Sequence, residues 1–194
     1  MAEPKADLHA YLRFAREALL WKLDGLPEYD VRRPLTPTGT NLLGLVKHLT
    51  GCEVGYFGDT FGRPFDGPPG WLTEDEDPNV DMWATPDESR EEIIGLYLRA
   101  CAHSDATIDE LPLDAGATVR HWPADRNQVT LHQILVHTIA ETHRHAGHAD
   151  IVRELIDGSA GLRLGNDNMA PGDRAWWQAH WNRVESAARQ AGRG

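Results

Sequence analysis

The stretch that decides the fold of this chain is Leu135-Val-His137-Thr-Ile-Ala-Glu141-Thr-His-Arg-His145-Ala-Gly-His148-Ala-Asp150. An α-helix turns by about 100° per residue, which brings four of its polar side chains into one narrow arc: those of His137, Glu141, His145 and His148. The apolar residues in the same arc are Ile134, Val152, Leu155 and Ile156, so we expect the helix to bury this side. A buried carboxylate beside several imidazoles is costly unless it is neutralised, and a bound divalent metal ion would neutralise it.

Length and composition are those of one soluble globular domain, which we expect to span residues 1–194. Hydrophobic residues make up 41% and charged residues 25% of the chain, and no apolar run approaches the length of a membrane span. The first residues have neither the basic patch nor the apolar core of a signal peptide. The only cysteines are Cys52 and Cys101, which excludes a disulfide framework and favours a reducing, cytoplasmic location.

The charge of the chain argues against nucleic acid as a partner. The formal net charge is −11, and Lys5, Lys22 and Lys47 are the only lysines. Phosphate binding depends on clustered Lys and Arg, and no glycine-rich phosphate loop is present. We therefore expect small-molecule partners, with neither nucleic acid nor a membrane among them.

Helical periodicity predicts an all-α bundle of four long helices. The expected ranges are 7–23, 41–57, 85–111 and 130–158, with a short extra C-terminal helix over 173–188 that packs as a fifth. Thr40 and Thr85 are the expected N-caps, the fourth helix is expected to start near Thr130, and Gly158 is the expected helix stop. No segment alternates convincingly enough to predict a sheet.

Two connections carry aromatic residues and are expected to border the end of the bundle. The link over 58–84 is long enough to cross along the bundle, and we expect its Trp71 or Trp83 to lie within reach of a bound ligand. The link over 119–128 contains His121 and Trp122. These rings either form walls of a pocket or only hold the loops against the core.

Glu141 and His145 are four residues apart, so their side chains project together from the helix. His48, inside the second helix beside core residues, is the best third ligand. Two imidazoles and a carboxylate with an open fourth position occur in catalytic zinc sites and in the non-haem iron facial triad. The alternative to a metal site is a hydrogen-bonded core histidine and a plain Glu–His salt bridge. His143 lies on the opposite side of the helix and is not expected to bind metal.

At these residues the sequence resembles a known family. Asn41-Leu-Leu-Gly-Leu-Val-Lys-His48 and the segment from Leu135 to Gly158 look like the DinB-like four-helix bundles. They resemble most closely an actinobacterial branch related to the mycothiol-dependent maleylpyruvate isomerase. The resemblance covers the chain from the first helix to Gly161.

The resemblance implies a bundle with a long crossover link and a divalent metal, zinc or nickel, held by three side chains. Most DinB-like proteins use three histidines, but the isomerase-like relatives have a glutamate in the middle, where Glu141 stands. The implied ligands are His48, Glu141 and His145. The implied activity is chemistry on a low-molecular-weight thiol such as mycothiol, although the isomerase's own C-terminal domain is missing from this sequence.

Three further residues on the helix are candidate catalytic groups. His137 and His148 either orient the ligands by hydrogen bonds or face the substrate as acid–base groups. Arg144, at the edge of the arc, either binds a carboxylate of the thiol or substrate or makes a surface salt bridge. Cys52 is interpreted as a small core residue.

Three functions fit these residues. The first is an S-transferase or isomerase that uses a metal and a thiol on a small electrophile. The second is a non-catalytic metal-binding stress-response protein, in which His137 or His148 closes the coordination. The third is an iron-dependent oxygenase, which ranks last because such triads usually sit in β-barrels. Exposed tryptophans near the C-terminus make a homodimer plausible.

Overall fold

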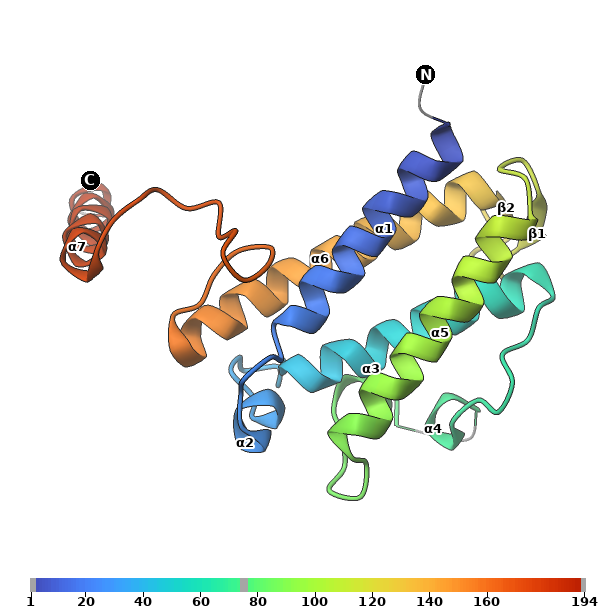
Figure 1. The fold of residues 1–194 in the computed structure, drawn as a ribbon, viewed down its shortest axis with the longest axis horizontal. Helices are drawn as coiled ribbons and strands as arrows, with labels where there is room; N and C mark the ends of the chain where they lie inside the picture. Colours follow the sequence, from blue (N-terminus) through green and yellow to red (C-terminus); the bar gives the residue numbers. More distant parts are fainter. Residues whose placement is uncertain (1–2, 74–76, 193–194) are drawn as a thin grey trace.

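The computed structural model describes residues 3–73 and 77–192. The predicted all-α bundle is confirmed (Figure 1). Its long helices are α1 (Pro4–Trp21), α3 (Leu42–Glu53), α5 (Arg90–Glu110) and α6 (Leu131–Asp157). α1 packs mainly against α6 and α3 mainly against α5, with a smaller contact between α3 and α6. Residues 74–76 of the predicted crossover link, and the outermost residues of the predicted domain, lie outside the described residues.

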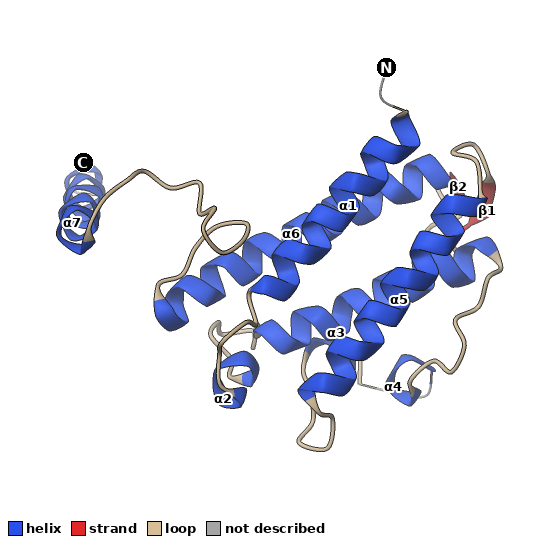
Figure 2. Ribbon diagram, in the orientation of Figure 1, coloured by secondary structure: helices blue, strands red, loops and turns tan. Residues whose placement is uncertain are grey.

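Short elements occupy the connections between the long helices (Figure 2). They are α2 (Glu28–Arg32), the π-helical turn η1 (Val54–Gly58), the 3-10 turn η2 (Asp59–Phe61), α4 (Gly70–Thr73) and the 3-10 turn η3 (Val80–Met82). η1 directly continues α3, so the second long helix extends to Gly58, close to its predicted end. None of the described helices is both long and apolar enough to cross a membrane.

A two-stranded sheet corrects the expectation that the chain has none. β1 (Gly116–Thr118) pairs antiparallel with β2 (Gln128–Thr130), and Gly116 lies opposite Thr130. Each strand has three residues, which is too short for an alternating pattern to stand out in the sequence. The hairpin closes the connection between α5 and α6 and buries Val129 and Val119 in the core.

The starts of two helices differ from those predicted. Asn41, rather than Thr40, caps α3, and its side-chain oxygen accepts a hydrogen bond from Gly44 N. α5 begins after Ser89 with a capping box, whereas Thr85 lies in a preceding turn in which Glu88 accepts a hydrogen bond from Thr85 N. That turn carries the same residue types as a helix start, which explains the misplacement.

The ends of α6 are confirmed. Thr130 is its N-cap and accepts a hydrogen bond from Gln133 N. Gly158 follows the last turn with φ of +79°, a left-handed conformation that glycine adopts without steric cost.

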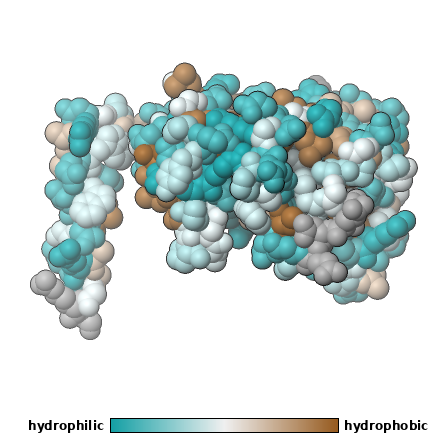
Figure 3. Space-filling model, turned by 90° about the horizontal axis from the view of Figure 1, so that it is seen from below, coloured by the Kyte–Doolittle hydropathy of each residue, from teal (hydrophilic) through white to brown (hydrophobic). Residues whose placement is uncertain are grey.

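The predicted C-terminal helix exists as α7 (Arg174–Ala191), capped by Asp173, but it does not pack as a fifth bundle helix. It buries none of its residues, and Trp181 and Val184 are more than half exposed. Figures 1 and 3 show it standing away from the main body at the end of an extended link. Its amphipathic sequence forms the helix, but helical periodicity alone does not supply a surface for it to bury against.

A polar layer divides the core into two apolar clusters. Each long helix contributes to both clusters and carries a polar residue between its two contributions. On α1 that residue is Arg16, between Leu12 and Leu19. Glu53 occupies the corresponding place at the end of α3, and Asp105 on α5. On α6, Glu141 and Thr142 lie between the residues of the two clusters.

Charge pairing satisfies the members of this layer on α1, α3 and α5. Arg16 Nε and Nη2 donate to the two carboxylate oxygens of Glu53, both at 2.7 Å, and Nη1 donates to Asp105 Oδ1 at 2.6 Å. Glu53 and Arg16 are almost fully buried, so each charge depends on the other for its solvation. The pair therefore ties α1 to α3 and α5 at one level of the bundle.

Arg16→Met should lower the free energy of unfolding by about 3–5 kcal/mol, because it leaves the Glu53 carboxylate buried without its partner. Chemical denaturation of the purified protein measures this. The double variant Arg16→Met/Glu53→Met should recover much of the loss. Arg189→Met, which breaks the exposed pair with Glu185, should change stability by no more than about 0.5 kcal/mol. Similar losses from Arg16→Met and Arg189→Met would contradict the role given to the buried pair.

Candidate metal centre

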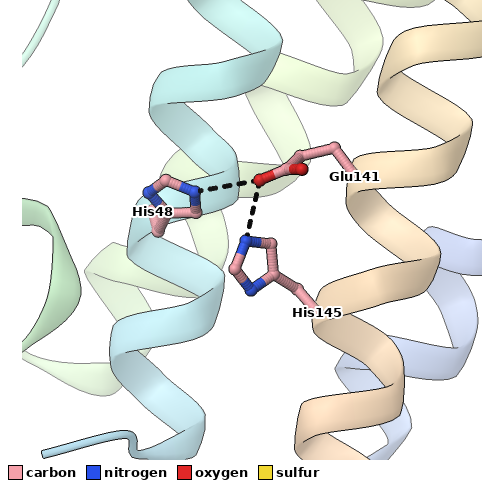
Figure 4. Close-up of side chains that lie close together, drawn as sticks. All are labelled: His48, Glu141 and His145. Atoms are coloured by element: carbon pink, nitrogen blue, oxygen red, sulfur yellow. Dashed lines mark hydrogen bonds and ion pairs between the residues drawn. The ribbon is translucent and has the colours of Figure 1, made fainter. Parts of the chain in front are cut away.

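His48, Glu141 and His145, the three predicted ligands, come together between α3 and α6 (Figure 4). One donor atom from each lies within 4.8 Å of the others. Nε2 of His145 is 2.9 Å and Nε2 of His48 is 3.7 Å from the same Glu141 oxygen, Oε1. The three donors thus surround one point and could hold a metal ion.

The side of α6 that carries these residues is less buried than expected. His145 is 8% exposed, but His137, Glu141 and His148 are only half-buried, and Leu155 is 63% exposed. The deepest side of α6 is instead turned by roughly 100° and carries Thr138, Thr142, Ala146 and Ala149. The reason is that α6 packs most extensively on α1, whereas the polar arc faces the looser contact with α3.

Hydrogen bonds orient both imidazoles so that Nε2 points at Glu141. Nδ1 of His48 is 2.8 Å from Asp81 Oδ2, and Nδ1 of His145 is 3.4 Å from Nδ1 of His148. In metal sites a ligating histidine characteristically donates its other ring N–H to a carboxylate or a similar acceptor, which fixes the tautomer. Asp81 and His148 occupy that position here. The two histidines therefore have the orienting hydrogen bonds of metal ligands, which a plain Glu–His salt bridge does not need.

Asp81 is held in place by the first turns of α3. Asn41 Nδ2 donates to the carbonyl oxygen of Met82 at 3.1 Å, and a Cβ at Gly44 would lie only 1.9 Å from that oxygen. Lys47 Nζ donates to Trp83 O at 3.1 Å. The segment 41–48 thus holds the end of the long link by hydrogen bonds, and the absence of a side chain at Gly44 lets η3 lie close to α3.

The electrostatics of the trio favour the protonation state that binds metal. Burial alone would raise the pKa of Glu141, but the hydrogen bond from His145 and the two nearby imidazoles hold it below its ordinary value. Burial, together with the neighbouring His48, lowers the pKa of His145. At neutral pH Glu141 is thus a carboxylate and His145 a neutral imidazole, and a bound metal would take the place of the proton between them.

Cys52 lies one turn after His48, and its Sγ is 3.7 Å from His48 Nε2. It does not belong to the group of donors within 4.8 Å, and burial raises the pKa of its thiol to about 12. The thiol is therefore protonated at neutral pH, in keeping with its interpretation as a small, largely buried residue.

Aromatic rings line one side of the polar arc. The ring of His137 is 4.7 Å from that of Tyr56 and 5.0 Å from that of Trp122. Burial lowers the pKa of His137. Tyr56 is placed by η1, and π-helical turns of this kind are frequent at functional sites. The 119–128 link thus supplies a wall beside the site.

That Trp71 or Trp83 lies within reach of a bound ligand stays a prediction. Trp71 has its ring 4.9 Å from Lys47 Nζ, and Trp83 is 45% exposed. The link reaches the site through Asp81. Sequence reasoning missed Asp81 and Tyr56: a lone aspartate in an acidic link gives no periodic signal, and a π-helical turn cannot be distinguished from α-helix by its apolar residues.

Arg144 is exposed on α6 and makes no ion pair with any residue that the structure describes. It is three residues after Glu141 and four before His148, so it shares their side of the helix. The surface salt bridge considered for it is absent from the described part of the chain.

His48→Ala, Glu141→Ala and His145→Ala should each lower metal affinity by more than the roughly 10–100-fold typical of losing an orienting hydrogen bond, because each removes a donor. Elemental analysis of protein purified without chelator and zinc titration measure this. His143→Ala is the control and should retain metal. An equal loss in the control would mean that the ligands are assigned to the wrong side of α6.

Asp81→Asn should lower metal affinity by about 10–100-fold without removing a ligand, because it weakens the hydrogen bond that orients His48. Gly44→Ala should act in the same direction, since its Cβ forces η3 away from α3. Competition with a chromogenic chelator gives the affinities. Asp66→Asn, in an exposed part of the same link, is the matched control. Unchanged affinity in both Asp81→Asn and Gly44→Ala would refute this positioning role.

Comparison with protein families gives an independent result. The profile described as mycothiol-S-transferase matches residues 7–158, from the first turns of α1 to the C-cap of α6. The extended link and α7 lie beyond the match. No curated protein matches the chain. Because the match covers more than half of the sequence and carries the resemblance expected from segments 41–48 and 135–158, the chain belongs to the mycothiol-S-transferase family, a DinB-like family.

Proposed function

We propose that this protein is a divalent-metal-dependent S-transferase that joins mycothiol to a small electrophile. The observation that carries the proposal is the trio of His48, Glu141 and His145, with the second ring nitrogen of each histidine already hydrogen-bonded. Family membership supports the thiol, and the three-donor set leaves a position for an external ligand. The proposal includes a cytoplasmic setting, where thiols stay reduced, and zinc or nickel as the metal.

Different residues of the chain would hold the metal, orient its ligands and transfer the proton. His48, Glu141 and His145 would hold the metal, while Asp81 and His148 orient the two imidazoles. A bound divalent cation would lower the pKa of a coordinated thiol and so supply a thiolate nucleophile near neutral pH.

His137 is the proposed acceptor of the thiol proton. Its pKa is lowered by burial, so the imidazole is neutral at pH 7 and has a free lone pair. Tyr56 and Trp122 cover its ring and limit the access of water. Arg144, exposed on the same side of α6, would attract the carboxylate of a thiol or substrate. With a chlorinated nitrobenzene, a carbon–sulfur bond forms, chloride leaves with its electron pair, and the proton passes through His137 to water.

Activity decides between this proposal and a non-catalytic metal-binding protein. The zinc-loaded protein is assayed with mycothiol, bacillithiol or glutathione and a chlorinated nitrobenzene, following the coloured thioether. Turnover should be fastest with mycothiol, should be lost in Glu141→Ala and should persist in His143→Ala. His137→Gln should lower kcat by about 100-fold or more and remove a pH-dependent step from the kcat profile. Absence of turnover with all three thiols would refute the S-transferase and favour the non-catalytic alternative.

A further inference from the structure

A hollow lies beside the aromatic wall formed by Tyr56 and Trp122, outside the metal trio. It is a cavity of about 490 Å³ at the junction of η1, η2 and the end of β1. The residues that supply its chemistry are Asp59, Thr60, Thr118, Arg120 and His121, and Gly55 forms part of its wall. Its volume falls within the range of roughly 300–1,000 Å³ that small-molecule sites occupy.

The hollow is connected to the trio through ring contacts. The ring of His121, which lines the hollow, is 5.8 Å from the ring of Tyr56. The Tyr56 ring is in turn 4.7 Å from that of His137, one helical turn before Glu141. The hollow therefore lies on the order of 15 Å or less from the trio. A molecule as long as a few residues is therefore long enough to touch both places, since one residue spans about 3.6 Å.

The chemistry of the lining selects a ligand rich in hydroxyl groups. Asp59 can only accept hydrogen bonds and Arg120 can only donate them, whereas the Thr60 and Thr118 hydroxyls can accept. Thr60 Oγ1 already donates to Gly55 O at 2.8 Å, which leaves its lone pairs available. A hydroxyl group is both donor and acceptor, so a ligand with several hydroxyls can satisfy both ions. An apolar ligand would displace water from both charged groups without replacing its hydrogen bonds.

We propose that this hollow binds the hydroxylated, non-reacting portion of the thiol co-substrate while its sulfur lies at the trio. The inference rests on the proposed function and assigns that function a second recognition site, at residues outside the predicted ligand set. The thiol is then selected by the loops at this end of the bundle, and the trio contacts only its sulfur.

Gly55 provides a clean way to fill the hollow. A Cβ added there meets no atom within 4 Å, so a larger side chain has room to start from this wall of the hollow. Gly95 on α5 is the matched control: it is also helical and half-buried, and its added Cβ meets only Arg99 Nη1 at 3.7 Å.

The test compares Gly55→Leu, Gly95→Leu and Arg120→Ala with the wild type. Calorimetry measures the Kd for mycothiol, whose non-reacting end is a hydroxylated pseudodisaccharide, in zinc-loaded and chelator-treated protein. Gly55→Leu should raise this Kd at least tenfold in both forms, and Arg120→Ala by about tenfold. KM for mycothiol should rise in parallel. Kinetic constants for N-acetylcysteine, which lacks the hydroxylated portion, should stay unchanged. Gly95→Leu should behave as wild type throughout.

The outcomes separate this inference from the proposed function. If no thiol is turned over but Gly55→Leu and Arg120→Ala still weaken mycothiol binding, the S-transferase proposal fails and the recognition site stands. If mycothiol is turned over and both variants bind it as tightly as the wild type, the recognition site is refuted. Absence of mycothiol binding to the wild type also refutes it. Arg120 is exposed, so its variant keeps the test decisive if Gly55→Leu fails to fold.

Discussion

The buried pairing of Arg16 with Glu53 is the interaction on which the arrangement of the bundle depends. It lies where the two apolar clusters of the core meet, and Asp105 extends it to α5. Apolar packing is non-directional and tolerates sliding of one helix along another, whereas a bidentate guanidinium–carboxylate pair has one geometry. The pair therefore fixes how α1, α3 and α5 are aligned along their axes, at a desolvation cost that the flanking clusters offset.

The relative positions of His48, Glu141 and His145 depend on this alignment of the helices. His48 lies five residues before Glu53 on the same helix, so the pair that fixes Glu53 also fixes the height of His48. α6 reaches the same level because it packs along α1, which carries Arg16. Glu141 and His145 then meet His48 with their donors within 4.8 Å. A slip of α3 by one helical turn, about 5.4 Å, would separate His48 from both.

The sequence predicted the parts of this site that follow from helical geometry, and missed those that depend on contacts between distant segments. Glu141 and His145 share a helix and their i,i+4 spacing, and the resemblance in segment 41–48 supported His48. Nothing in the sequence indicated that Asp81 would reach back to His48, because its position depends on the close approach of η3 to Gly44. Helical periodicity also placed Leu155 on the buried side of α6, but Leu155 is exposed. Periodicity identifies the apolar side of a helix, but it does not show which neighbour covers the last turns.

These differences show where selectivity can arise in such a bundle. The long helices supply the candidate metal donors. The same three donors suit many reactions, so they cannot by themselves distinguish one thiol or electrophile from another. The residues around them come from the connections: Asp81 from η3, Tyr56 from η1 and Trp122 from the hairpin loop. Connections tolerate insertions and substitutions that the aligned helices do not. On the proposed function, the bundle therefore holds the reacting sulfur, and the loops at its end determine which thiol brings it.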